Sequence, residues 1–265
     1  MPIATINGQK INYTDAGSGA VVIATHATLM DLVSLEPVTT KLVDAGYRVV
    51  AFDLRGHGQT VYDQQPYNYI DVAGDVLGLA DHLGIDRFAF LGEGQGAVVA
   101  LRTALLAPER VQALALIGPT ADSSSEGEQA ALTAAIELWC DSGPVPDIWG
   151  TVAVYATGTP EDAAALMARW NASAWRDYRP AADALGSRPR FVDQLPAITC
   201  PTLVLHGTGD LYVPPALGRE VADNISGPTR FVEIENPRQA ITIAFDPRVA
   251  AEILPWLAGV VDDSA

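Results

Sequence analysis

Residues 87–106, RFAFLGEGQGAVVALRTALL, join a short apolar block to a helical pattern through three closely spaced glycines. The block at 88–91 (FAFL) predicts a buried strand, and apolar residues recur at helical spacing from 96 to 106. A strand that passes directly into a helix through Gly92, Gly94 and Gly96 predicts a tight bend at the end of the strand. The rest of the chain repeats the strand and helix on either side of this bend.

Short apolar blocks alternate with helical patterns along most of the sequence. Further strands are predicted at residues 20–24, 48–52, 113–117, 202–205 and 229–234. Helices are predicted at residues 35–46, 69–83, 215–225 and 247–257. This alternation predicts an α/β fold with a doubly wound, mostly parallel sheet and right-handed crossovers. Ligands of such sheets bind beyond the carboxyl ends of the strands.

Residues 121–195 interrupt this alternation with a helical and aromatic segment. Thr159 precedes a proline and two acids, which is typical of a helix start. We interpret the segment as a helical cap inserted into an α/β core formed by residues 1–120 and 196–265. We expect most of its tryptophans to pack the cap onto the core and one or two to face a ligand; they are Trp139, Trp149, Trp170 and Trp175.

The composition excludes several classes of partner. The net charge of −16 disfavours binding to nucleic acid or to anionic membranes, and no apolar run has the length of a membrane span. The N-terminus lacks the features of a signal peptide, so we expect a cytoplasmic protein. Cys140, Cys200 and the four histidines show no metal-binding spacing. GEGQG lacks the spacing of a dinucleotide site, so we expect neither a metal nor another cofactor.

Four stretches resemble the α/β-hydrolase family. VVIATHATLMD at 21–31 resembles the family's oxyanion loop, and FDLRGHGQT at 52–60 resembles the loop after the next strand. Residues 81–119 resemble the helix, strand, elbow, helix and strand around the nucleophile. CPTLVLHGTGDLYVPP at 200–215 resembles the strand and turn that present the triad acid. Together they cover almost the whole chain outside the cap, in the family's order, and imply the α/β-hydrolase fold.

The resemblance also implies where the catalytic residues should stand. Gly94 occupies the nucleophile position of the G-x-S-x-G elbow. Asp210 occupies the position of the acid, and counting back from Pro247 places Ala240 at the position of the histidine. Ser-His-Asp catalysis needs an attacking oxygen and a base beside it. With both positions lost, the usual acyl-enzyme route is not available.

The remaining parts of the site are still chemically useful. The resemblance assigns an oxyanion hole to the backbone N–H groups of Thr28 and Gln95. The missing side chains should enlarge a mainly apolar pocket beside Asp210, which is either a structural turn residue or a base whose burial raises its pKa. Glu93 is a weaker alternative to Asp210. Side chains that could border the pocket mouth are His26, Asp31, Tyr62, Tyr67 and Tyr69.

These expectations leave three functions open. The first is a cofactor-independent, non-hydrolytic enzyme, such as a cyclase, lyase, isomerase or decarboxylase, acting on a hydrophobic small molecule. The second is a non-catalytic protein that binds a small molecule. The third is a hydrolase inactivated by substitution at positions 94 and 240. The sequence favours the first.

Overall fold

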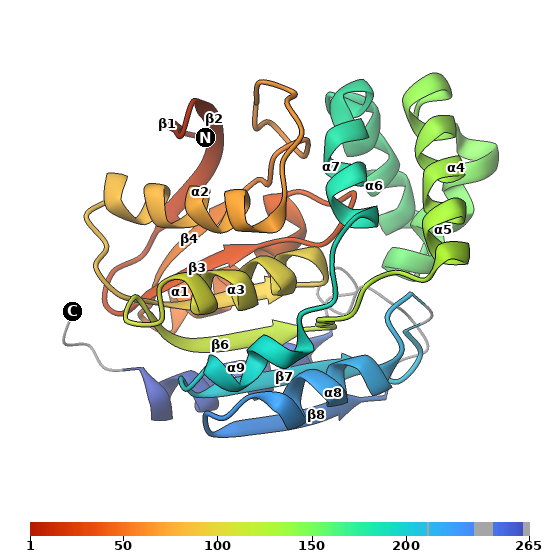
Figure 1. Ribbon diagram of the computed structural model, residues 1–265. Helices are drawn as coiled ribbons and strands as arrows, with labels where there is room; N and C mark the ends of the chain where they lie inside the picture. Colours follow the sequence, from red (N-terminus) through yellow and green to blue (C-terminus); the bar gives the residue numbers. More distant parts are fainter. Residues whose placement is uncertain (211, 236–245, 262–265) are drawn as a thin grey trace.

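The computed structural model describes residues 1–210, 212–235 and 246–261 and contains one eight-stranded sheet with helices on both faces (Figure 1). The strand order is β1-β2-β4-β3-β5-β6-β7-β8. Strands β3 to β8 are parallel, while β1 and β2 are antiparallel to their neighbours. The predicted fold class is confirmed. The strands are β1 (Ile3–Ile6), β2 (Gln9–Ala16), β3 (Val21–Thr25), β4 (Arg48–Phe52), β5 (Phe88–Glu93), β6 (Val111–Ile117), β7 (Thr202–Gly207) and β8 (Thr229–Ile234).

The sequence did not predict the first two strands. Exposed and buried residues alternate along β1, and β2 ends in half-buried and exposed residues. Strands of this kind lack the continuous apolar run that marks the fully buried β3. A search for apolar blocks therefore finds the parallel strands and misses the antiparallel edge.

Two hydrophobic cores lie on opposite faces of the sheet. Side chains of α2 (Tyr69–His82), α3 (Gln95–Leu106) and α8 (Pro215–Asn224) contribute to one core. Side chains of α1 (Glu36–Asp44) and α9 (Pro247–Val260) contribute to the other. All five helices were predicted, with ends that differ by at most three residues from those observed. Because helices cover both apolar faces of the central strands, β3, β5 and β7 are buried along their whole length, whereas the edge strand β8 is only partly buried.

Helices without an intervening strand fill the chain between β6 and β7. They are α4 (Glu126–Ser142), α5 (Pro146–Thr157), α6 (Pro160–Ala172) and α7 (Arg179–Gly186), with short 3₁₀ turns at Trp175–Tyr178 and Val192–Ala197. Thr159 caps α6 as predicted, because its hydroxyl accepts the N–H of Asp162 (3.1 Å). We call α4 to α7 the cap helices. They stand together at one end of the sheet (Figure 1) and contact the loops that follow β3 and β7.

Candidate active site

The bend at Gly94 has the geometry that the glycine spacing predicts. Gly94 joins β5 to α3 with φ +52° and ψ −109°, a conformation that residues with a Cβ rarely adopt. Its N–H donates to the Ile117 carbonyl (2.8 Å) on β6, and the Gly96 N–H donates to the His26 carbonyl (3.1 Å) after β3. A Cβ at Gly96 would overlap the Thr25 carbonyl. Close backbone contacts to both neighbouring strands therefore hold the bend.

Gly94 itself brings no side chain to this bend. A Cβ placed at Gly94 would lie 3.2 Å from the Cβ of Ala27, so a side chain here would project toward the loop after β3. Glycine leaves that space open. Ala240, the other position that the sequence identified as lost, lies outside the described residues.

Three of the four histidines are buried and bonded to the main chain. His26 is fully enclosed, with Nδ1 bonded to the next carbonyl (2.9 Å) and Nε2 accepting an N–H (3.2 Å). This places His26 beneath the oxyanion loop and not at the pocket mouth. Burial, with help from His26, lowers the pKa of His57 to about 3. His206 donates through Nε2 to a carbonyl (2.7 Å), and His82 is exposed at the end of α2.

Asp210 combines a turn role with a second carboxylate oxygen that remains available. Its Oδ1 accepts the backbone N–H groups of Tyr212 and Val213, both at 2.9 Å. Its Oδ2 lies 3.9 Å from His206 Nε2 and accepts no hydrogen bond within the described part of the chain. Burial raises the pKa of Asp210 above its usual value, against the opposing effect of these hydrogen bonds. A Cβ at Gly118, directly after β6, would lie 3.5 Å from Oδ2, which places the carboxylate beside the strand that also anchors the bend.

The backbone N–H groups of Thr28 and Gln95, which the resemblance assigns to an oxyanion hole, have no acceptor among the described residues. Gln95 begins α3, where the first N–H groups of a helix have no intrahelical acceptor. The two side chains lie together, because the Thr28 hydroxyl donates to Gln95 Oε1 (3.0 Å). Paired donors at a helix N-terminus can stabilise negative charge on a ligand oxygen.

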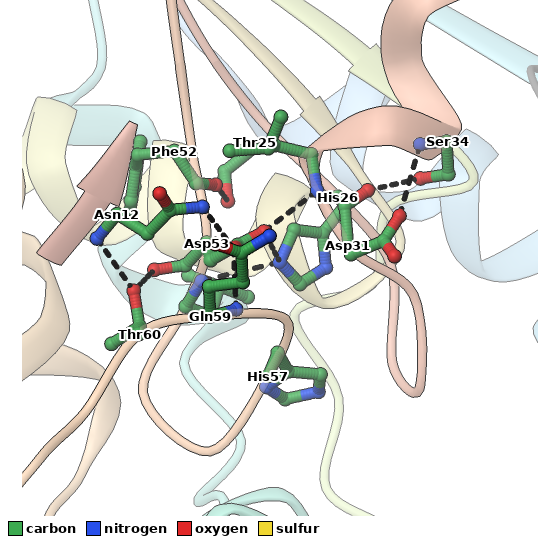
Figure 2. A network of polar contacts seen from close by, with 12 residues as sticks. Asn12, Thr25, His26, Asp31, Ser34, Phe52, Asp53, His57, Gln59 and Thr60 are labelled. Atoms are coloured by element: carbon green, nitrogen blue, oxygen red, sulfur yellow. Dashed lines mark hydrogen bonds and ion pairs between the residues drawn. The ribbon is translucent and has the colours of Figure 1, made fainter. Parts of the chain in front are cut away.

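A buried carboxylate, which the sequence analysis did not single out, supports the loop after β3. Asp53 follows β4 and is 1% exposed. Figure 2 shows its carboxylate at the centre of a polar network. It accepts the N–H of Leu32 (2.8 Å), the side-chain amide of Asn12 (2.7 Å) and the N–H of Gln59 (2.8 Å). Asp53 thus joins β2, the loop after β3 and the loop after β4. An acid directly after a wholly apolar strand is the signal that could have identified it.

The cap helices close over the loop after β3. Trp170 donates through Nε1 to the Leu29 carbonyl (2.5 Å), and Arg169 pairs with Asp31 (3.1 Å). Trp139 packs edge-to-face against both Trp149 (4.7 Å between ring centroids) and Trp170 (5.3 Å). These contacts confirm the expected packing role of most of the tryptophans.

A cleft remains between the cap helices and the loops after β3 and β4. Asp31, Trp139, Trp170 and Trp175 contribute to its lining, whereas Trp149 does not. Asp31 and three of the four tryptophans therefore line this narrow cleft, and the expectation that one or two tryptophans face a ligand stays a prediction.

The three candidate tyrosines and Glu93 are buried or have hydroxyls bonded to the main chain. Tyr62 donates to the Asp177 carbonyl (2.5 Å) and Tyr67 donates to the Arg55 carbonyl (3.0 Å), so both hydroxyls serve structural bonds. Tyr69 is buried at the start of α2. Glu93 is 3% exposed at the end of β5. The Tyr69 hydroxyl is buried and has no hydrogen-bond partner among the described residues.

Within residues 1–210, 212–235 and 246–261, no group of three or more potential metal ligands occurs. No helix in the same ranges is long and apolar enough to cross a membrane.

Comparison with known proteins extends the resemblance over most of the chain. The chain is 28% identical over 250 residues to a non-heme haloperoxidase from Rhodococcus erythropolis, covering 84% of this chain and 86% of that protein. It is 34% identical over 110 residues to epoxide hydrolase 3 from Siraitia grosvenorii, but this match spans only 35% of that protein. The enol-lactonase from Burkholderia xenovorans LB400 shares the fold, with a TM-score of 0.86, 24% identity and coverage of 97% and 100%.

The family model for serine aminopeptidase S33 matches residues 17–236, which include the oxyanion loop, the bend and Asp210. The relatives named above carry the names of enzymes. The chain therefore belongs to the serine aminopeptidase S33 family of the α/β-hydrolase superfamily.

Proposed function

We propose that this protein is a cofactor-independent, non-hydrolytic enzyme that acts on a hydrophobic small molecule. The observation that carries the proposal is the bend at Gly94, where the Gln95 N–H is without an acceptor among the described residues and Gly94 has no side chain for covalent attack. Such donors favour a reaction in which negative charge develops on a carbonyl oxygen.

Asp210 supplies the acid–base group of the proposed reaction. It takes a proton from the carbon next to the ligand carbonyl, the C–H electron pair moves into the C–C bond, and the carbonyl becomes an enolate. The N–H groups of Thr28 and Gln95 hold the enolate oxygen. A carboxylate whose pKa is raised by burial is a stronger base than an ordinary aspartate. Enolate formation is a step that lyases, isomerases, cyclases and decarboxylases can share.

Proton exchange tests the proposal without knowledge of the natural substrate. We expect the native chain to accelerate exchange of the α-protons of butyrophenone with D₂O, followed by NMR. We expect Asp210→Asn to abolish the acceleration while preserving the turn, because the asparagine oxygen can still accept both N–H groups.

Two other results would overturn the proposal. Saturable binding of butyrophenone without any exchange would identify a binding protein. Esterase turnover in the double variant Gly94→Ser, Ala240→His, with no exchange by the native chain, would identify an inactivated hydrolase. The 3.2 Å separation between a Cβ at 94 and Ala27 leaves this variant sterically possible.

A further inference from the structure

Three buried polar atoms belong to side chains that line one narrow cleft and have no hydrogen-bond partner. The cleft lies between the cap helices and the loops after β3 and β4, and His57, Trp139 and Tyr178 contribute to its lining. These residues are 5%, 2% and 3% exposed. Within the described ranges, His57 Nε2, Trp139 Nε1 and the Tyr178 hydroxyl form no hydrogen bond. Because buried polar groups are normally bonded, three such atoms around one cleft call for an explanation.

Ring contacts hold the three side chains together. Tyr178, at the end of the 3₁₀ turn Trp175–Tyr178, packs edge-to-face against His57 with 5.0 Å between the ring centroids. The Trp139 ring of α4 lies 6.3 Å from the Tyr178 ring by the same measure. One loop of the core and two elements of the cap therefore bring unsatisfied polar side chains to the same place.

The three atoms differ in the hydrogen bonds that they can form. His57 Nδ1 lies 2.9 Å from the Arg55 carbonyl, which can only accept, so Nδ1 carries the hydrogen and Nε2 presents a lone pair. Burial lowers the pKa of His57 to about 3, so Nε2 remains an acceptor at neutral pH. Trp139 Nε1 can only donate, and the Tyr178 hydroxyl can donate or accept.

A hydroxyl group satisfies this set of atoms. It can donate its hydrogen to His57 Nε2 and accept from Trp139 and Tyr178, whereas a carboxylate has no hydrogen to donate and an ammonium group cannot accept. The charged side chains on the cleft neutralise each other, because Asp31 pairs with Arg169 (3.1 Å). The cleft has a volume of about 20 Å³, which is enough for one water-sized group.

We propose that His57, Trp139 and Tyr178 form a subsite for the hydroxyl group of an otherwise apolar ligand, such as a phenol. The apolar part of the ligand packs against Met30 and Trp175, which also line the cleft. Because the three polar atoms are closed to water, the hydroxyl reaches them when the cap moves slightly away from the loop after β4. The subsite is independent of the proposed function; taken together, the two make the substrate a hydrophobic hydroxy ketone.

Three matched probes test the subsite in the native chain. Phenol can donate and accept, anisole can only accept, and fluorobenzene does neither appreciably. In calorimetric titrations we expect phenol to bind at least about tenfold more tightly than fluorobenzene, with anisole between them. Tyr178→Phe should reduce the preference for phenol several-fold and leave the affinity for fluorobenzene unchanged, because it removes only a hydroxyl that has no partner in the described part of the chain.

Trp149 provides the matched control for Trp139. Its Nε1 is also buried without a partner among the described residues, but Trp149 does not line the cleft. The variants Trp139→Phe and Trp149→Phe each lack one indole N–H and so identify the two resonances in ¹⁵N-labelled protein. Phenol should move the Trp139 indole proton downfield by more than the Trp149 proton, and Trp149→Phe should keep the preference for phenol.

Several results would refute the subsite. They are equal affinities of the native chain for phenol and fluorobenzene, equal affinities for phenol and anisole, no binding of phenol at millimolar concentration, and a Trp139 resonance that phenol leaves unchanged. If Trp139→Phe or Tyr178→Phe does not fold, the affinities of the native chain still decide. The proposed function fails separately, through absent α-proton exchange in a chain that still prefers phenol.

Discussion

Replacing Gly94 by alanine should destabilise the protein, although glycine-to-alanine changes usually do the opposite. At an unstrained position this change stabilises a protein by about 0.4–1 kcal/mol, because it restricts the unfolded chain. Gly94 has φ +52° and ψ −109°, and a Cβ there would also approach the Cβ of Ala27 to 3.2 Å. A sparsely populated backbone conformation costs about 1–3 kcal/mol. We therefore expect Gly94→Ala to lower the free energy of unfolding by about 1–3 kcal/mol.

Urea denaturation, with the midpoint and the m-value fitted for each variant, measures this change. Gly127→Ala is the control, because Gly127 is exposed on α4 with nothing within 4 Å of the added Cβ, and alanine should stabilise that helix by up to about 1 kcal/mol. Gly96→Ala should cost more than Gly94→Ala, because its Cβ would overlap the Thr25 backbone. If Gly94→Ala were as stabilising as Gly127→Ala, the bend would not be held in this conformation, and our reasoning about the elbow would be wrong.

Three further changes test the surrounding network and its charges. Asp53→Ala leaves three donors without their acceptor, two of them in buried hydrogen bonds, and should cost about 3 kcal/mol or more by urea denaturation. A loss below about 1 kcal/mol would contradict the supporting role of Asp53. Burial lowers the pKa of His57 to about 3 in the folded chain, so the unfolded chain protonates this histidine first as the pH falls. The free energy of unfolding should therefore decline below about pH 6.5, and His57→Gln should make this decline less steep. An equally steep decline in the variant would argue against the assignment. The raised pKa of Asp210 acts in the opposite direction: its contribution is most favourable below pH 3.8 and is lost as the pH rises through the raised pKa. Asp210→Asn should therefore gain in melting temperature relative to the native chain as the pH rises above 3.8, and a constant difference would oppose this.

The central parallel strands were predictable because they are apolar on both faces and fully buried. The bounds of β4 and β8 agree with the predicted ranges 48–52 and 229–234. The antiparallel strands β1 and β2 could not be found in the same way, since their residues are partly exposed and polar. Pairing between β2 and β4 depends on residues far apart in the sequence, which periodicity does not reveal.

Two parts of the candidate site, the bend at Gly94 and the turn at Asp210, were predictable because local backbone conformation determines them. The spacing of three glycines identified the bend, and the turn around Asp210 identified a carboxylate with the predicted backbone contacts. The role of Asp53 depends on which donors lie opposite it after folding. Nothing near Asp53 in the sequence indicates that the Asn12 side chain and the Leu32 N–H will donate to it.

The amide resonances of Thr28 and Gln95 test the central claim most directly. In a titration of ¹⁵N-labelled protein with butyrophenone, we expect the amide protons of both residues to move downfield together and to saturate with one dissociation constant, because each donates a hydrogen bond to the ketone oxygen. Saturable binding that leaves both resonances unchanged while others shift would contradict the claim that these two N–H groups polarise the ligand.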